Sequence, residues 1–328
     1  QPLRLPAEGA AAVEVGGGLT RGAGVGRVSV DESLVETYVA HVVNTLERPV
    51  SLDGIKVVVD CANGAAFQAA PAAFEAQGAD VHRIHAQPDG ININDNCGST
   101  HMESLRAAVL EQHADIGIAL DGDADRCLAV DTFGRIVDGD QILAILALAL
   151  REQGRLKNDT VVATVMSNLG FVNAMRGLGI TVQQTKVGDR YVLEAMKAGG
   201  FILGGEQSGH IVMLEHATTG DGVLTALHLM NRMATSGQSL AQLASVMTRL
   251  PQVLINVPDV DRKRAATDPQ LSAAVAEAQA ELGDSGRVLL RPSGTESLVR
   301  VMVEAESYEA ANAVAHRLAD AVKAFLAL

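Results

Sequence analysis

IGIALDGDADR, residues 116–126, is the stretch that decides the fold, and it joins an apolar run to an acidic loop. A short apolar run bounded by turn residues predicts a buried strand. Asp121, Asp123 and Asp125 alternate directly behind that strand. Crowded carboxylates on a tight turn suit Mg²⁺, which takes few protein ligands and leaves room for water and a phosphate oxygen. The stretch therefore predicts a Mg²⁺ site, with Arg126 placed to bind the phosphate.

Three other kinds of loop share part of this pattern. A calcium EF-hand begins in the same way but needs Gly at its sixth position and Glu at its twelfth, where this chain has Arg126 and Thr132. A phosphatase with Asp121 as nucleophile also needs a downstream Lys and an acidic metal partner, whereas the stretch after Asp138-Gly-Asp140 is apolar. A solvated acidic turn is the third, and it leaves three like charges repelling one another without a cation.

Strand and helix patterns alternate on both sides of the acidic loop, which is typical of an α/β layer with largely parallel strands. The strands predicted are 55–60, 79–84, 115–120, 159–165, 181–185 and 201–203. The helices are 32–46, an Ala-rich helix after Asn63-Gly64, 105–111, 142–150, 169–178 and 191–198. After Pro251 the order changes to strands 253–257, 287–290 and 298–304 with helices 269–282 and 308–325.

These patterns predict an α/β fold class. We expect two tandem α/β domains, with mixed, largely parallel sheets and helices on both faces, plus a C-terminal small α+β domain. The predicted domains are 28–153 with the metal-binding loop, 154–252 with a sugar-binding loop and 253–328 with a phosphate-binding loop. The Ala- and Gly-rich residues 1–27 are expected to be a linker or the remnant of a missing first domain.

Composition excludes several classes of protein. The formal net charge of −13 over 328 residues argues against an extended nucleic-acid footprint, which needs a basic face. The three cysteines lack a C-x-x-C spacing, so neither a disulfide framework nor a zinc site is expected from their pattern. The longest apolar run, 142–150, is far short of a membrane span. We therefore expect a cytoplasmic protein with a small-molecule partner and no membrane partner.

A second loop, Gly204-Gly-Glu-Gln-Ser-Gly-His210, is suited to binding hydroxyl groups. Glu206 can accept two hydrogen bonds from a sugar and Ser208 can add a third, while the glycines let the backbone approach closely. His210 titrates near neutral pH and could transfer a proton. A lone His after a Gly turn is more often structural, but its position beside Glu206 favours a functional role.

A third loop, Arg291-Pro-Ser-Gly-Thr-Glu296, lies between two predicted strands and contains the components of a phosphate cradle. A guanidinium, two hydroxyls and a flexible glycine can surround an anion. An ordinary hairpin turn is an equally good interpretation of this loop alone. Lys186 and Arg190 form a weaker signal for a phosphate contact.

Together, and in this order, the three loops closely resemble the α-D-phosphohexomutase superfamily, over roughly residue 24 to the C-terminus. The details resemble the phosphoglucosamine mutase family: Ala124 in the metal loop, Gln207 in the sugar loop, and Asn92-Ile-Asn94 leading to Cys97-Gly-Ser-Thr-His101. That family interconverts glucosamine 6-phosphate and glucosamine 1-phosphate through a 1,6-bisphosphate and a phosphoserine. The resemblance implies Mg²⁺ as cofactor, glucosamine 1,6-bisphosphate as activator or intermediate, and an isomerase.

The resemblance also implies roles for individual residues. Asp121, Asp123 and Asp125 would hold the metal, and His210 and Arg126 would be catalytic. The substrate-binding residues implied are Glu206, Ser208, Arg291, Ser293, Gly294, Thr295 and Arg300, with Lys186 and Arg190 as further phosphate contacts.

One departure from the family is important. The family's phosphoserine lies in a T/S-A-S-H-N-P segment of its first domain, and this chain has no such segment. We therefore expect the chain alone to lack turnover. The alternatives are a non-catalytic module that binds hexosamine phosphates and a related phosphoglucomutase or phosphomannomutase. The sequence leaves open whether the chain is a monomer or a dimer. A smaller departure is Ser297, where the family usually has Pro.

Overall fold

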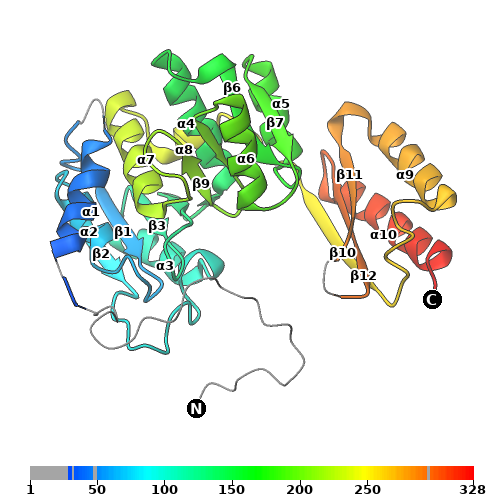
Figure 1. Ribbon diagram of the computed structural model, residues 1–328, viewed down its shortest axis with the longest axis horizontal. Coiled ribbons are helices and arrows are strands. Elements are labelled where there is room, and N and C mark those ends of the chain that lie inside the picture. Colours follow the sequence, from blue (N-terminus) through cyan, green and yellow to red (C-terminus); the bar gives the residue numbers. More distant parts are fainter. Residues whose placement is uncertain (1–28, 32, 47–49, 294–295) are drawn as a thin grey trace, which may run out of the picture.

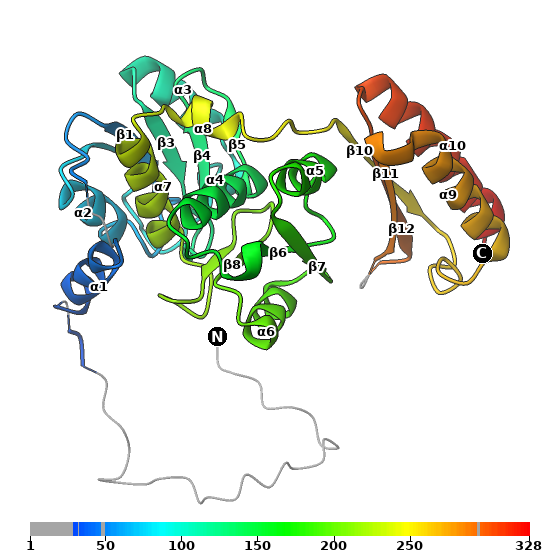
Figure 2. The ribbon, with the colours of Figure 1, turned by 90° about the horizontal axis from the view of Figure 1, so that it is seen from above.

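The computed structural model describes residues 29–31, 33–46, 50–293 and 296–328. Figures 1 and 2 show three sheets that follow one another along the chain, each with its own helices. The expected fold class is confirmed: two α/β layers are followed by a small α+β unit. Among the described residues, no helix combines the length and apolar character needed to cross a membrane.

The first sheet has the order β2-β1-β3-β4-β5. Strand β1 pairs in parallel with both β2 and β3, and β4 and β5 are added antiparallel at one edge. Its elements are α1 (Ser33–Asn44), β1 (Lys56–Asp60), α2 (Ala69–Glu75), β2 (Asp80–Ile84), α3 (Glu103–Gln112), β3 (Ile116–Ala119), β4 (Leu128–Asp131) and β5 (Ile136–Val137), with a 3₁₀ turn at Gly98–Thr100. The sequence pattern predicted neither β4 nor β5, which are only four and two residues long.

The second sheet repeats this design in the order β7-β6-β8-β9, with β9 antiparallel at the edge. Its elements are α4 (Gly139–Glu152), β6 (Thr160–Thr164), α5 (Leu169–Gly177), β7 (Thr181–Thr185), α6 (Asp189–Gly199), β8 (Leu203–Gly205), β9 (Ile211–Met213), α7 (Gly222–Ser236) and α8 (Leu240–Ala244). A 3₁₀ turn at Lys157–Asp159 precedes β6. Strand β9 and helices α7 and α8 were not predicted. Helix α4 packs against α5, α7, α8 and β8.

The C-terminal unit has an antiparallel sheet in the order β10-β12-β11. Helices α9 and α10 cover one face of this sheet, as Figure 2 shows. Its elements are β10 (Gln252–Pro258), α9 (Pro269–Leu282), β11 (Arg287–Pro292), β12 (Leu298–Glu304) and α10 (Tyr308–Phe325), with a 3₁₀ turn at Gly283–Ser285. Strand β11 extends two residues beyond the prediction, so Arg291 and Pro292 end a strand and do not lie in the loop.

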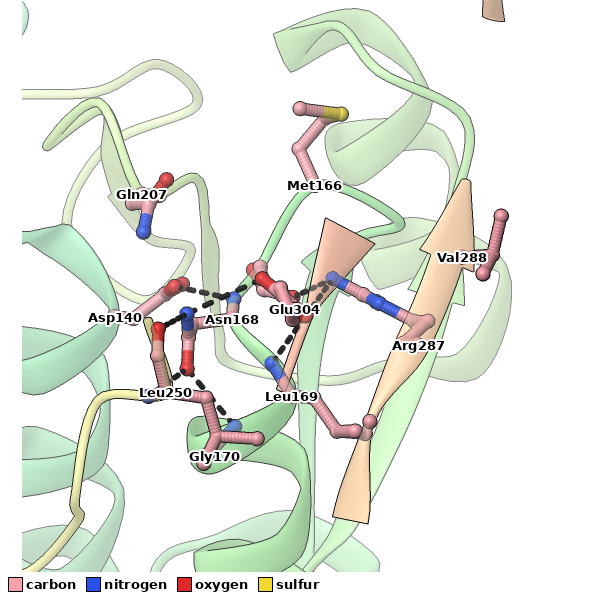
Figure 3. Close-up of polar contacts among 12 residues, drawn as sticks. Asp140, Met166, Asn168, Leu169, Gly170, Gln207, Leu250, Arg287, Val288 and Glu304 are labelled. Carbon is pink, nitrogen blue, oxygen red and sulfur yellow. Dashed lines mark hydrogen bonds and ion pairs between the residues drawn. The ribbon is translucent and has the colours of Figure 1, made fainter. Parts of the chain in front are cut away.

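A polar junction connects the C-terminal unit to the second sheet (Figure 3). Glu304 of β12 is fully buried and accepts hydrogen bonds from the Leu169 amide, at 3.0 Å, and from the Asn168 side chain, at 3.1 Å. Arg287 lies 2.8 Å from the same carboxylate and also donates to the Ser167 carbonyl. The backbone N–H of Asn168 in turn donates to the Asp140 carboxylate at 2.7 Å. The junction therefore reaches from β12 to the start of α4.

Candidate active site

The acidic loop lies between β3 and β4, at the carboxyl end of β3, where open α/β sheets bind ligands. Each of Asp121, Asp123 and Asp125 offers a carboxylate oxygen, and these three oxygens lie within 4.8 Å of one another. Ala124 adopts a left-handed conformation with φ of 59°, which closes the turn. The loop thus brings together the three carboxylates that the sequence singled out.

The electrostatics of this loop fit a divalent cation. Burial and the neighbouring Asp125 carboxylate raise the pKa of Asp121 to about 6. The Nε of Arg126 lies 3.5 Å from an oxygen of Asp121 and 3.7 Å from one of Asp125. That nitrogen is buried and has no hydrogen-bond partner. The three carboxylates repel one another, and Arg126 only partly offsets their charge. Such a group of oxygen ligands suits Mg²⁺, which prefers carboxylates.

His210 is buried directly behind the acidic loop, with 4% of its surface exposed. Its Nδ1 lies 3.0 Å from Asp125, and its Nε2 accepts a hydrogen bond from the Gly220 amide at 3.1 Å. Because Nε2 accepts, the ring proton sits on Nδ1 and is donated to Asp125. A histidine that is engaged at both nitrogens orients a carboxylate, as outer partners of metal ligands do.

The backbone joins the metal loop to the sugar loop. The Cys127 amide donates to the Gly209 carbonyl at 3.0 Å, and Arg126 forms a β-bridge with His210. Gly209 has φ of +94°, and a Cβ at that position would lie 2.5 Å from the Cys127 carbonyl oxygen. Only glycine permits this approach. Two loops that are far apart in sequence are therefore held side by side.

A cleft of about 480 Å³ opens beside the sugar loop. It is lined by Glu206 and Ser208, as the sequence predicted, and also by Ser99, Thr164 and Arg249. One Glu206 oxygen already accepts the Gly188 amide at 2.9 Å, while the Ser208 side chain is exposed. The cleft therefore offers hydroxyl, carboxylate and guanidinium groups to a polar ligand.

The phosphate loop gathers cations at the end of the third sheet. Arg291 and Arg300 are direct partners in the β11–β12 ladder, so two like charges lie side by side. Ser293 is buried and accepts the Glu296 amide at 3.2 Å, while Arg262 donates to the Ser293 carbonyl. Paired guanidinium groups attract an anion. Gly294 and Thr295 lie outside the described residues.

Lys186 and Arg190 are less well placed than the other cations. Lys186 is exposed and lies 5.9 Å from the centre of the Tyr191 ring. Arg190 is exposed and pairs with Glu194 at 2.8 Å along α6. Gly188 between them contacts Glu206, so this turn adjoins the sugar loop. Their predicted contact with phosphate stays a prediction.

Sequence reasoning missed two arginines. Arg262 donates to the carbonyls of Ser293 and Glu296 and so braces the phosphate loop. Arg249 lines the cleft and lies 3.6 Å from Asp138. Neither belongs to a recognisable motif, because each reaches its loop from a separate segment. No local signal marked either residue.

Comparison with known sequences divides the chain into three recognised parts. Residues 36–134 match alpha/beta/alpha domain II of the phosphoglucomutase/phosphomannomutase family, 138–250 match its alpha/beta/alpha domain III, and 254–321 match its C-terminal domain. The chain is 68% identical over 307 residues to a phosphoglucosamine mutase of a Nocardioides species, which covers 94% of this chain and 68% of that protein. It is 65% identical to a phosphoglucosamine mutase of Frankia alni, over 93% of this chain and 67% of that protein.

Solved structures show the same fold. The N-acetylphosphoglucosamine mutase of Aspergillus fumigatus superposes with a TM-score of 0.75 at 23% identity, over 90% of this chain and 65% of that one. A phosphoglucomutase/phosphomannomutase family protein of Burkholderia thailandensis gives 0.72 at 23% identity, over 89% and 64%. The chain thus spans about two thirds of the length of these proteins. With three matched domains in the family's order, the chain belongs to the phosphoglucomutase/phosphomannomutase family of phosphohexomutases.

Proposed function

We propose that this chain is the metal-, sugar- and phosphate-binding part of a phosphoglucosamine mutase, which interconverts glucosamine 6-phosphate and glucosamine 1-phosphate through a 1,6-bisphosphate. The observation that carries the proposal is the connection between the loops. His210 links Asp125 to the sugar loop, and the Cys127–Gly209 hydrogen bond fixes the spacing between the two. The naming of the Nocardioides and Frankia relatives supports the amino sugar as substrate.

Each loop has a distinct task in this proposal. Asp121, Asp123 and Asp125 would hold Mg²⁺, which when bound neutralises charge on a transferring phosphoryl group. Glu206 and Ser208 bind sugar hydroxyls in the cleft, since a carboxylate accepts two such hydrogen bonds. A cytoplasmic location and the phosphoserine that the family uses stay predictions.

Binding at the far end of the substrate falls to the C-terminal unit. Arg291 and Arg300 attract the phosphate that is not reacting, and Ser293 lies at the start of the same loop. His210 orients Asp125 in this proposal and transfers no proton itself, because both its ring nitrogens are engaged.

Isothermal titration calorimetry with Mg²⁺ in excess tests the proposal. Glucosamine 6-phosphate should bind more tightly than glucose 6-phosphate, mannose 6-phosphate or inorganic phosphate. Glu206→Gln should weaken binding of glucosamine 6-phosphate by about 10-fold, because it removes roughly one charge-assisted hydrogen bond. Glu277→Gln, an exposed carboxylate on α9, is the matched control. If inorganic phosphate binds as tightly as every sugar phosphate, the proposed substrate is wrong.

Catalysis is measured separately by following the phosphorus resonances of the 6- and 1-phosphates with a hexose 1,6-bisphosphate present. Binding without interconversion agrees both with the proposed mutase part, in which no phosphoserine segment occurs, and with a binding module, the alternative that the sequence left open. Interconversion that is lost in Asp123→Asn would support the mutase.

A further inference from the structure

A second group of metal-ligating side chains lies outside the aspartate loop. It consists of Asp60 at the end of β1, His85 directly after β2, and Cys97 before the 3₁₀ turn. One ligand atom from each of the three lies within 4.8 Å of the other two. Asp60 and Cys97 are fully buried, and the His85 side chain is 31% exposed. A carboxylate, an imidazole and a thiol converge here from three segments.

The contact between His85 and Asp60 is unusual. Their Nδ1 and Oδ2 atoms lie 3.0 Å apart, yet the buried Nδ1 makes no hydrogen bond. Ligands at about 2.0–2.2 Å from a tetrahedral zinc ion lie about 3.3–3.6 Å from one another, so a bound ion needs these two atoms to move apart by only a few tenths of an ångström. The two atoms are not aligned as donor and acceptor, so Nδ1 is available to a metal ion.

Backbone hydrogen bonds and backbone conformation hold these side chains in place. Both Asp60 oxygens accept amides, Oδ1 from Ala62 and Oδ2 from Gly98, each at 2.9 Å, so the carboxylate cannot rotate freely. His85 has φ of 47°, a left-handed conformation that is uncommon outside glycine. Ligands held by such outer hydrogen bonds bind metals more tightly.

Of the three side chains, His85 borders a cavity. The cavity has a volume of about 870 Å³, and Asn63, Gln87 and Asn92 also line it. Three protein ligands with a position open to solvent are the arrangement of an accessible zinc site. The thiol excludes Mg²⁺ and Ca²⁺ as preferred occupants, because those cations select oxygen ligands.

We propose that Asp60, His85 and Cys97 form a second metal site, selective for Zn²⁺ or a similar borderline divalent cation. Binding replaces the proton on the Cys97 thiol with the metal, and the proton passes to solvent. The site would close the segment 85–97 onto the end of β1. The 3₁₀ turn that follows this segment contacts the residue before the aspartate loop, since the Ser99 amide donates to the Leu120 carbonyl, and the Leu120 amide donates to the Asp60 carbonyl.

Cobalt absorption tests the site without reference to activity. The metal-free chain is first saturated with Mg²⁺ and then titrated with Co²⁺, whose bond to a thiolate gives a near-ultraviolet charge-transfer band. We expect the band to saturate at one equivalent and to be abolished by Zn²⁺. Cys97→Ser should remove it, and His85→Gln should weaken Co²⁺ binding by more than about 100-fold, since losing even an outer partner costs about 10–100-fold.

Two variants serve as matched controls. Cys61 is a buried free thiol that packs in the main core with Val57 and Val59, on the opposite face of the chain from Asp60, so Cys61→Ala should keep the band. Asp123→Asn, in the aspartate loop, should also keep it. Absence of a band, its survival in Cys97→Ser, or its loss in Asp123→Asn would each overturn the proposal. His85→Gln changes a partly exposed ring, so it tests the site even if Cys97→Ser folds poorly.

Discussion

His210 and Asp125 show how one pair of side chains couples two loops. The imidazole donates through Nδ1 to Asp125 and accepts the Gly220 amide through Nε2. Gly220 itself cannot carry a side chain, because a Cβ there would lie 2.6 Å from the His210 Nδ1. The tautomer and orientation of the ring are therefore fixed by its surroundings, and the position of Asp125 with them.

The aspartate loop gives the first prediction. Asp123 is exposed, so Asp123→Asn should leave the fold intact while removing a charged oxygen ligand. We expect Mg²⁺ affinity, measured by calorimetry, to fall by about 100-fold or more. Asp53→Asn, an exposed aspartate in the turn before β1, should leave it unchanged. Equal Mg²⁺ affinity in the two variants would show that the loop does not hold the metal.

A second prediction compares two glycines with positive φ. Gly209→Ala places a Cβ 2.5 Å from the Cys127 carbonyl oxygen, whereas at Gly237 nothing lies within 4 Å. Left-handed backbone costs a non-glycine residue about 1–2 kcal/mol, and overpacking adds about 1–3 kcal/mol. In urea denaturation, Gly209→Ala should lose about 2–5 kcal/mol and Gly237→Ala only about 1–2. Similar losses would mean that the loops are not closely packed.

At the scale of elements, the start of α4 concentrates buried carboxylates. Asp138 caps the helix and forms a capping box with Gln141. Asp140, two residues later, is fully buried and accepts the Asn168 amide. Burial, with the nearby Asp138 charge as a smaller cause, raises the pKa of Asp140 to about 7. The first turn of α4 is thus sensitive to pH at its junction with α5.

The third prediction concerns this pH dependence. Since the folded-state pKa of Asp140 exceeds its ordinary value of 3.8, its contribution to stability is complete below about pH 4 and is lost as pH rises through 7. Asp140→Asn removes this titration. Relative to the unmodified chain, the variant should therefore gain about 2–3 kcal/mol in free energy of unfolding between pH 5 and pH 7.5.

Denaturation curves at several pH values measure this gain. Asp284→Asn, an exposed aspartate after α9, should follow the unmodified chain at every pH. Parallel curves for Asp140→Asn and the unmodified chain would contradict the raised pKa.

At the scale of the whole molecule, the C-terminal unit is attached through a small polar junction. Burial raises the pKa of Glu304, and Arg287 opposes this shift by stabilising the carboxylate. Two amide hydrogen atoms, from Leu169 and the Asn168 side chain, complete its partners. The placement of the phosphate loop relative to the cleft therefore depends on one buried ion pair and its hydrogen bonds.

The fourth prediction tests this junction. Arg287→Met leaves the Glu304 carboxylate buried without its cation, which costs about 3–5 kcal/mol. The C-terminal unit should separate from the second sheet, and small-angle X-ray scattering should show an increased radius of gyration. Arg317→Met breaks a half-exposed pair with Glu281 inside the unit, worth about 0–1 kcal/mol, and should leave the scattering unchanged. Identical scattering from both variants would exclude this role of Arg287.

The sequence alone determined the α/β layers, because strand and helix periodicity is a local property of successive residues. It also determined the residue types of the three loops, and it placed the aspartate trio directly behind β3. The short strands β4 and β5 were missed, since two to four residues carry too little periodic signal.

Only the tertiary structure decided which loops and side chains meet. Asp125 and His210 are 85 residues apart, and Asn168 and Glu304 are 136 apart. The cysteine spacing predicts no zinc site, yet the parallel pairing of β1 and β2 brings Asp60 and His85 beside Cys97. Contacts between distant segments depend on how sheets and helices pack, and a linear pattern of residue types does not record that packing.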